Sequence, residues 1–213
     1  MKTLFLSLIL CMSITENYAQ FFMGKVKYRV EPRNPNPALM SDEEYRKKNP
    51  NLSAHYETMV FKDNKYKYTN GNKIELFDPA TARVYNYNLN SDTCLYQDAN
   101  FSSDNMVDLK ASPETDSVLG YKCEAITIKT MWGKTTYFFN RNQFKVDYVK
   151  FSSHNYKNLS AYFKEAKVIP LKIVVKTAFN CDVYTATAIK EEFIDDIDFK
   201  VPNFKYPIKN KHQ

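Results

Sequence analysis

The chain has 213 residues, a formal net charge of +6 and four cysteines. A chain of this length can bury a sizeable core without cross-links, so disulfides are not needed for folding. Its charges are spread along the sequence instead of forming a basic arm, which speaks against a nucleic-acid-binding protein. No cofactor is expected, because the four glycines are scattered and cannot form a phosphate-binding or dinucleotide-binding loop.

Residues 1–19 have the pattern of an export signal. Lys2 supplies the positive charge, Leu4–Met12 the apolar stretch, and Ala19 the small residue that cleavage requires. The apolar stretch is much shorter than the ~20 residues of a membrane-spanning helix. We therefore expect an exported protein, periplasmic or extracellular, without a transmembrane span. Residues 20–213 are predicted to form a single β-rich domain, with a frayed basic tail from about residue 203.

Alternation of apolar and charged residues predicts strands in the first half of the chain. In Lys25–Val30, every second residue is Val or Tyr and the others are Lys or Arg, which is typical of a half-buried strand. Asn70-Gly71 is the signal of a two-residue hairpin turn. The strands predicted here are Lys25–Val30, Glu57–Lys62, Lys65–Thr69, Lys73–Phe77, Arg83–Leu89 and Cys94–Tyr96.

Two short helices are predicted. Ser41 and Glu44 form a capping box, after a stretch Glu31–Pro37 whose three prolines exclude a central strand. The second helix is expected within Asn155–Lys167, where apolar residues recur at helical spacing: Leu159, Tyr162, Phe163 and Ala166.

The strongest hairpin signal lies in the middle of the chain. Cys123–Thr130 and Thr135–Asn140 are rich in β-branched and aromatic residues and flank a turn, and Phe144–Phe151 follows as a third run. We expect these three strands near the centre of a twisted antiparallel sheet. Leu171–Thr177 and Val183–Phe193 are predicted to form the last hairpin. Gln97–Ser117 is polar and contains Pro113, so it is predicted to be a long irregular connection.

No catalytic pair is predicted around the histidines. His154 follows Ser152 and Ser153, but adjacent residues in an extended chain point to opposite faces, so we expect a solvated turn histidine. His55 and His212 offer no better arrangement.

An acidic turn lies near the C-terminus. Asp195, Asp196 and Asp198 are oxygen ligands of the kind that Ca²⁺ prefers. A charged turn that keeps a sheet edge soluble explains them better, and we favour that interpretation. No metal site is therefore predicted.

Three cysteines follow the export signal, and an oxidising compartment favours one bridge among them. Three pairings are open: Cys94, Cys123 and Cys181 offer no spacing that singles one out. We favour Cys94–Cys123 because their strands are close in sequence and could be neighbours in a meander. The spacing lacks the Cys-x-x-Cys or His pairs of a zinc site.

The chain is rich in aromatic residues, with 16 tyrosines and 15 phenylalanines against one tryptophan. They could fill a core beneath one face of the sheet. Alternatively, a strongly curved sheet could leave a concave cleft lined by Phe and Tyr, with the tyrosine hydroxyls at its wet rim. Such a cleft would bind an apolar or acyl ligand.

Several short motifs together resemble a group of exported bacterial proteins. They are the signal ending Ala19-Gln20, the strand that opens at Gly24, the segment Val118–Cys123 and the late segment Phe199–Pro202. These resemble proteins of the GLPGLI type and relatives of the lipoprotein-sorting carriers, the LolA/LolB-like proteins. The region that corresponds to the GLPGLI signature reads Lys167-Val-Ile-Pro-Leu-Lys172 here. The resemblance implies a half-open antiparallel barrel covered by helices, and no catalytic residues.

The sequence thus predicts a mainly β fold: a single curved antiparallel sheet with two or so short helices on its concave side. The expected function is that of a non-enzymatic envelope protein that binds an acyl chain, an apolar ligand or a lipoprotein segment. The alternative is a protein–protein adaptor in the envelope that uses strand edges or the 97–117 loop.

Overall fold

The computed structural model describes residues 21–205 and 209–210. Twelve strands in this part of the chain form one sheet in the order β12-β6-β5-β4-β3-β2-β1-β11-β10-β9-β8-β7, antiparallel except for the pairing of β12 with β6. The strands are β1 (Gly24–Arg33), β2 (His55–Lys62), β3 (Lys65–Asn70), β4 (Lys73–Asp78), β5 (Arg83–Asn88), β6 (Cys94–Asp98), β7 (Met106–Val118), β8 (Tyr121–Thr130), β9 (Gly133–Phe139), β10 (Lys172–Thr177), β11 (Cys181–Glu191) and β12 (Lys209–Asn210). The helices are α1 (Asp42–Lys48) and α2 (Leu159–Ala166), with 3-10 turns η1 (Tyr148–Phe151), η2 (Tyr156–Asn158) and η3 (Asp196–Phe199).

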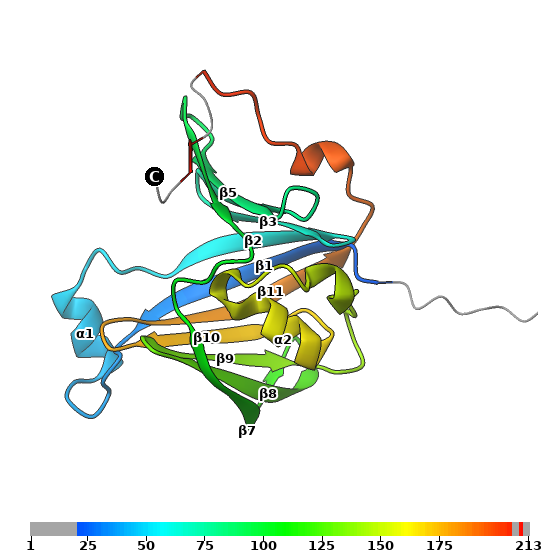
Figure 1. Cartoon of the computed structure of the whole chain (residues 1–213). Helices are drawn as coiled ribbons and strands as arrows, with labels where there is room; N and C mark the ends of the chain where they lie inside the picture. Colours follow the sequence, from blue (N-terminus) through cyan, green and yellow to red (C-terminus); the bar gives the residue numbers. More distant parts are fainter. Residues whose placement is uncertain (1–20, 206–208, 211–213) are drawn as a thin grey trace, which may run out of the picture.

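The pair β1 and β11 lies in the interior of the sheet, seventh and eighth in the strand order (Figure 1). Strands β2 to β6 extend from one side of this pair and β10 to β7 from the other. The predicted fold class is confirmed: one curved, open antiparallel sheet with few helices. The β8–β9 meander, however, lies beside the edge strand β7 and not at the centre. The centre is set by a pairing between strands more than a hundred residues apart, which local patterns do not reveal.

Both predicted helices are present. In α1, the Ser41 hydroxyl accepts a hydrogen bond from the Glu44 N–H at 3.2 Å and the Glu44 carboxylate accepts one from the Ser41 N–H at 3.1 Å, as the capping box predicts. No residue of α1 is buried, and the helix lies at one end of the sheet. Helix α2 instead covers the concave face, into which it buries Tyr162, Phe163 and Ala166 (Figure 1).

The predicted strand Phe144–Phe151 is wrong. Phe144 has a φ of +53°, which a strand does not adopt, and the last four residues form η1. Within this segment Lys145 forms an isolated β-bridge with Val168. The segment leaves the sheet and crosses its concave face, where Val146 and Phe151 are buried. Its apolar residues therefore reflect packing onto the sheet and not pairing within it.

The predicted irregular connection Gln97–Ser117 is also wrong. Most of it is β7, a strand of 13 residues at the edge of the sheet that pairs with β8. Most β7 side chains are exposed. Their polar character is typical of an edge strand that is protected against pairing with other chains. Its register shifts between Ser112 and Asp116, around Pro113, which an edge strand tolerates. The irregular part that remains is residues 99–105.

Apolar side chains are buried on both faces of the sheet. The larger core lies on the concave face beneath α2 and the segment that precedes it. The smaller core lies on the other face of β2–β6, where residues 192–204 cover it with Ile194 and Phe199. Near the C-terminus, the Phe204 ring packs edge-on against Tyr87 at 5.3 Å, and β12 pairs with β6. The predicted export signal, residues 1–19, and residues 206–208 and 211–213 lie outside the described residues.

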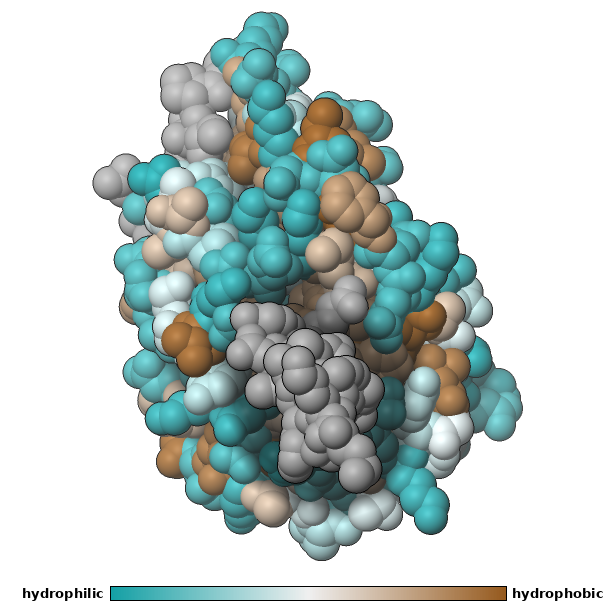
Figure 2. Space-filling view, turned by 90° about the vertical axis from the view of Figure 1, so that its right-hand side faces the viewer, coloured by the Kyte–Doolittle hydropathy of each residue, from teal (hydrophilic) through white to brown (hydrophobic). Residues whose placement is uncertain are grey.

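No helix within residues 21–205 is long and apolar enough to cross a bilayer. Figure 2 shows the end of the molecule opposite α1. Its surface is mainly hydrophilic, and hydrophobic residues form small separate groups there.

Candidate functional site

A cleft of about 320 Å³ lies on the concave face, between the sheet and a cover made of η2, the start of α2 and residues 102–104. Strand alternation places its wall: Ile173 pairs in register with Tyr137 and Tyr184, so these three side chains lie side by side on one face. The wall combines six tyrosines with four aliphatic residues: Tyr28, Tyr66, Tyr68, Tyr137, Tyr156 and Tyr184, with Met59, Leu159, Ile173 and Val175.

Several tyrosine rings of the wall are held in place. The Tyr28 hydroxyl donates to the carbonyl of Pro170 at 2.6 Å, and the Tyr66 hydroxyl donates to Glu75 Oε1 at 2.8 Å. The Tyr137 ring stacks on Tyr162 of α2 at 4.3 Å. Burial raises the pKa of Tyr184 to about 12, so its hydroxyl stays protonated at physiological pH. These contacts give a pre-formed wall of tyrosine side chains.

An ion pair joins the cover to the sheet. Lys157 Nζ lies 2.9 and 3.1 Å from the two carboxylate oxygens of Glu75, and both residues line the cleft. Burial raises the pKa of Glu75, but the Lys157 ammonium and the Tyr66 hydroxyl lower it by more. Burial likewise lowers the pKa of Lys157, but the charge of Glu75, its hydrogen bond and the neighbouring tyrosines together raise the pKa by more. Both groups are therefore charged and neutralise one another.

The backbone at this ion pair is strained. Lys157 and Asn158 have φ values of +55° and +57°, in the left-handed region that residues with a Cβ rarely adopt. The Asn158 side chain donates to the Asp104 carbonyl at 2.9 Å, which ties residues 102–104 to the same cover. The strained turn thus presents Lys157 to the cleft at the point where the cover meets the rim.

His154 lies beside the cleft, in the core. Its ring is fully buried and stacks on Phe77 at 4.2 Å and on Tyr66 at 5.1 Å, and neither ring nitrogen has a hydrogen-bond partner among the described residues. Burial lowers the pKa of His154 to about 3, so the ring is neutral. The expected solvated turn histidine is therefore wrong: His154 acts as a flat aromatic ring in the packing.

A second polar cluster occupies the concave face on β2 and β3. Glu57 is buried and accepts hydrogen bonds from Tyr68 and from Asn70, the latter at 2.6 Å. His55 Nε2 lies 2.9 Å from Glu57 Oε1. Burial lowers the pKa of His55, but the hydrogen bonds to Glu57 and to the Ser53 carbonyl and the nearby carboxylate charges together outweigh it, so the pKa is raised. The Tyr68 hydroxyl is therefore committed to a buried carboxylate and does not sit at a wet rim.

The structure separates the two aromatic residue types that the sequence left together. The cleft wall holds six tyrosines and, among its described residues, no phenylalanine. The phenylalanines of the concave face fill the core next to it: Phe61, Phe77, Phe139, Phe151 and Phe163. Both interpretations of the aromatic content therefore apply, each to a different part of the same face.

The favoured Cys94–Cys123 bridge is wrong. All three described cysteines are free thiols, each buried. Cys94 lies on β6 and Cys123 on β8, and these strands are second and eleventh in the sheet order. Closeness in sequence does not make them neighbours because β1 and β11 intervene. Burial raises the pKa of Cys94 to about 11, which leaves it a poor nucleophile.

The acidic turn has structural partners. The Asp195 side chain accepts a hydrogen bond from the Ile197 N–H at 3.0 Å and so caps η3. Asp196 Oδ1 lies 3.2 Å from Lys62 Nζ and 3.3 Å from Lys65 Nζ. These contacts fasten residues 192–204 onto β2 and β3.

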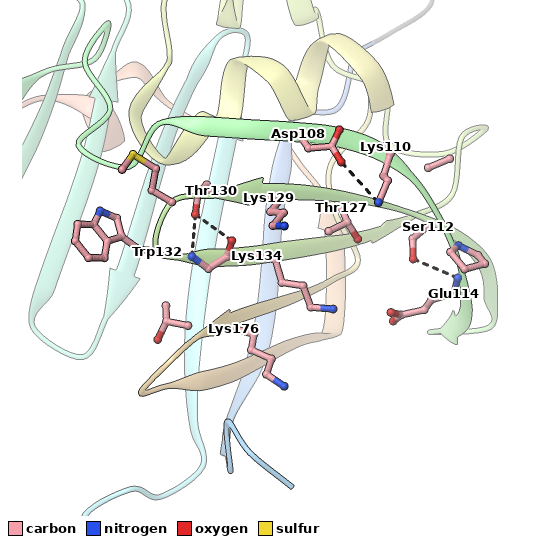
Figure 3. Close-up of a pocket in the computed structure, with 15 residues that line it drawn as sticks. Asp108, Lys110, Ser112, Glu114, Thr127, Lys129, Thr130, Trp132, Lys134 and Lys176 are labelled. Atoms are coloured by element: carbon pink, nitrogen blue, oxygen red, sulfur yellow. Dashed lines mark hydrogen bonds and ion pairs between the residues drawn. The ribbon is translucent and has the colours of Figure 1, made fainter. Parts of the chain in front are cut away.

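A larger hollow, of about 680 Å³, lies over β7–β10 on the opposite face of the sheet (Figure 3). It is wider open, and charged residues and threonines dominate its wall: Asp108, Lys110, Glu114, Thr127, Lys129, Thr130, Lys134, Lys176 and Thr177. The smaller cleft is the more enclosed of the two and has a mainly apolar wall with a few convergent polar groups, as is typical of ligand sites, so we take it as the candidate site.

Comparison with known proteins yields a fold and no family. No family model matches the chain, and no curated protein matches it in sequence. Among solved structures, it is similar to PNGF-II in two crystal forms, with TM-scores of 0.51 and 0.50 and 12% and 13% identity. The matches cover 89% and 90% of this chain but 31% and 32% of PNGF-II, so the chain spans about a third of that protein.

Two smaller proteins match along most of both chains. One is an uncharacterised conserved protein from Thermus thermophilus, with a TM-score of 0.47, 8% identity and coverage of 89% of this chain and 91% of that one. The other is a LolA superfamily protein from Nitrosomonas europaea, with a TM-score of 0.28, 10% identity and coverage of 84% and 90%. At these identities the comparisons describe the fold alone.

Proposed function

We propose that this protein is a non-enzymatic carrier of the cell envelope that holds an acyl chain, free or attached to a lipoprotein, in the tyrosine-lined cleft. The observation that carries the proposal is the cleft itself: about 320 Å³ of space on the concave face, with tyrosine rings and aliphatic side chains for its wall. A purely structural protein would fill this space, as the phenylalanines do beside it.

The wall suits an apolar chain with a polar end. Met59, Leu159, Ile173 and Val175 provide the apolar contact, and burial of a ligand against them stabilises a complex by roughly 25 cal/mol per Å² before the costs of association. The Ser103 hydroxyl lies on the cover side, where it can hydrogen-bond a headgroup, whereas Ser102 and Asn158 donate to the Asp104 carbonyl and hold the cover together. Affinity then comes from the wall and orientation from the cover.

The ionisable groups of the cleft support binding better than catalysis. Glu75 and Lys157 neutralise one another, and Glu75 also accepts from Tyr66. A general acid or base needs a group that is free to exchange a proton near neutral pH, and both of these are held in their charged forms. We therefore assign the ion pair to holding the cover over the ligand.

Binding of a fluorescent fatty acid tests the proposal. Val175 lies in the cleft wall, and a Val175→Trp substitution should fill the space and weaken binding of dansyl-undecanoic acid at least about tenfold. Val149 is 61% exposed on η1 and lies outside the cleft, so Val149→Trp is the matched control and should bind like the wild type. The proposal fails if the wild type does not bind the probe, or if both variants bind equally.

Export is the second part of the proposal, and it rests on residues 1–19. Mass spectrometry of the protein recovered from the cell envelope should find a chain that begins near Gln20. Recovery of an unprocessed chain from the cytoplasm would contradict the proposed export and would not bear on the proposed ligand binding.

The adaptor alternative has one observation in its favour. Strand β7 has 13 residues and is the last of the sheet order, so no other described strand pairs with its outer edge. Such an edge can accept a strand of another protein. A pull-down from envelope extract separates the two functions, because an adaptor brings down a stoichiometric protein with both wild type and Val175→Trp, whereas a carrier does not.

A further inference from the structure

Three lysines lie side by side on the face of the sheet opposite the ligand cleft. Lys129 on β8 pairs in register with Lys134 on β9, and Lys134 pairs with Lys176 on β10. Residues directly opposite on adjacent strands have Cβ atoms about 4.5–5.5 Å apart, and like charges in such positions destabilise a sheet. None of the three forms an ion pair within residues 21–205. We call these residues the lysine row.

The lysine row forms one wall of the hollow over β7–β10 (Figure 3). Lys110 adds a fourth cation, and its ammonium lies 3.6 Å from the Asp108 carboxylate. Glu114 is the other acidic residue of the wall. Four cations against two carboxylates leave the hollow positively charged, so its chemistry complements an anionic surface.

Large apolar side chains project from the turns next to the lysine row. Met131 and Trp132, in the β8–β9 turn, are each 69% exposed, and Phe179, in the β10–β11 turn, is 84% exposed. Gly133 pairs with Thr177, which brings the two turns together at the α1 end of the sheet (Figure 1). A Cβ at position 133 would lie 2.2 Å from the Lys176 carbonyl oxygen, so glycine permits this close approach. We call Met131, Trp132 and Phe179 the apolar tips.

The spacing between the tips and the row matches the depth of a membrane interface. Lys129 and Lys134 each lie two residues from the nearer of Met131 and Trp132, which corresponds to about 7 Å at the rise of a strand. Interfacial segments bury their apolar side chains about 5–10 Å deep, at the boundary of headgroups and acyl chains. Tips at that depth would place the lysine ammonium groups at the level of the lipid phosphates.

We propose that the apolar tips and the lysine row form a docking surface for an anionic lipid bilayer. The tips enter the interface, where Trp is favoured, and the row contacts the negative headgroups. A dissolved polyanion would explain the lysines but leave three exposed apolar side chains without a contact, so the bilayer is the partner that accounts for both features.

The docking surface is connected to the ligand cleft but does not depend on it. The Trp132 N–H donates to the Asp104 carboxylate at 3.3 Å, and Asp104 lines the cleft. Thr130 and Val175, also in the cleft wall, adjoin Met131 and Lys176 in the chain. Docking would therefore bring the cleft next to the bilayer. Binding of the fatty-acid probe and binding to vesicles are separate measurements, so either can fail alone.

Trp132 is the only tryptophan of the chain, and its fluorescence reports insertion directly. Vesicles of phosphatidylcholine and phosphatidylglycerol should shift its emission to the blue, and pure phosphatidylcholine vesicles should not. The variant Lys129→Gln/Lys134→Gln/Lys176→Gln should bind the anionic vesicles about 100-fold more weakly in a flotation assay. It should fold at least as stably as the wild type, because it removes repulsion between like charges.

The control removes equal charge elsewhere, as Lys67→Gln/Lys122→Gln/Lys164→Gln, and should bind within about threefold of the wild type. All variants share the same N-terminal residues, so differences between them report on the docking surface. Phe179→Ser should weaken binding to anionic vesicles without changing folding. The proposal is overturned if Trp132 emission does not shift, if both lysine variants bind equally, or if the protein binds heparin with the same dependence on Phe179.

Discussion

The concave face of the sheet has a packed part and an open part, and the difference between them lies in the aromatic residues each uses. In the packed part, Phe77, Phe151 and Phe163 stack in sequence, with ring centroids 6.2 and 4.4 Å apart. In the open part, tyrosines line a space of about 320 Å³. Phenylalanine lacks a polar atom and can be enclosed on all sides, whereas a tyrosine hydroxyl must find a partner, and that requirement fixes the ring at one end.

Hydrogen bonds of the tyrosine hydroxyls therefore maintain the open part, and close packing of the phenylalanine rings maintains the packed part. Tyr66 belongs to both, since its ring stacks on His154 and its hydroxyl donates to Glu75. The boundary between the parts runs through Tyr66, Glu75 and His154. Substitutions in the packed part should lower stability most, and substitutions at the boundary should reveal which charges hold the cover.

The largest effect is expected in the packed part. Phe151→Ala should lower the free energy of unfolding by about 3–5 kcal/mol, because it leaves a cavity beneath α2 where the Phe151 ring now stacks on Phe163 at 4.4 Å. The matched control, Phe179→Ala at an exposed turn, should change it by less than about 0.5 kcal/mol. Urea denaturation measures both. A loss below about 1 kcal/mol for Phe151→Ala would show that the packed part does not hold the fold.

The next effect depends on pH and comes from His154. Its pKa is about 3 in the folded protein, against an ordinary value of 6.5, so as the pH falls below 6.5 the unfolded chain takes up a proton that the folded protein does not. The wild type should therefore lose about 2 kcal/mol of stability between pH 6.5 and 5, at about 1.36 kcal/mol per unit. His154→Phe keeps the ring stack and should remove this loss. Urea denaturation at pH 7 and pH 5 measures the difference.

His55 provides a contrast of opposite sign. Its folded pKa is raised above 6.5, so its contribution to stability is fully present below 6.5 and is lost as the pH rises through the folded value. His55→Gln should therefore lower stability at pH 5 more than at pH 8.

For the His154 prediction, equal pH profiles for the wild type and His154→Phe would mean that His154 is accessible to protons in the folded protein.

The sequence predicted the sheet and most of its strands because alternation and turn residues are local signals. The capping box of Ser41 and Glu44 and the helix around Tyr162 were predictable for the same reason. What failed was non-local. Strand β7 is polar because it is an edge, and Phe144–Phe151 is apolar because it packs across the sheet. Neither role can be read from a window of neighbouring residues.

The sequence predicted the kind of site, an aromatic cleft, but not the residues that form it. An excess of tyrosine indicated an aromatic cleft, but the pair of Lys157 and Glu75, separated by 82 residues, has no signature in the sequence. The lysine row is hidden in the same way, since its members belong to three strands and meet through register alone. The expected wet rim of tyrosine hydroxyls was wrong for Tyr66 and Tyr68 because each donates to a buried carboxylate.

The smallest effect in stability is expected at the boundary ion pair, and it should be asymmetric. Lys157→Met leaves the Glu75 carboxylate without its cation, and the Glu75 side chain is 11% exposed, so unfolding free energy should fall by about 1–2 kcal/mol. This is below the value for a fully buried pair because the Lys157 side chain is 52% exposed. Glu75→Gln leaves a lysine that water can reach, and its effect should be about half as large.

The double variant Glu75→Gln/Lys157→Met distinguishes a pair that holds the cover from two independent surface charges. If the charges act as a pair, the double variant loses less stability than the sum of the two single variants. At pH values above its ordinary pKa of 4.5, Glu75 contributes stability, and this contribution is lost as the pH falls through the lowered pKa of the folded protein. Lys157→Met should remove that part of the acid profile. Strict additivity, with an unchanged acid profile, would mean that the cover is held by the tyrosines and α2 alone.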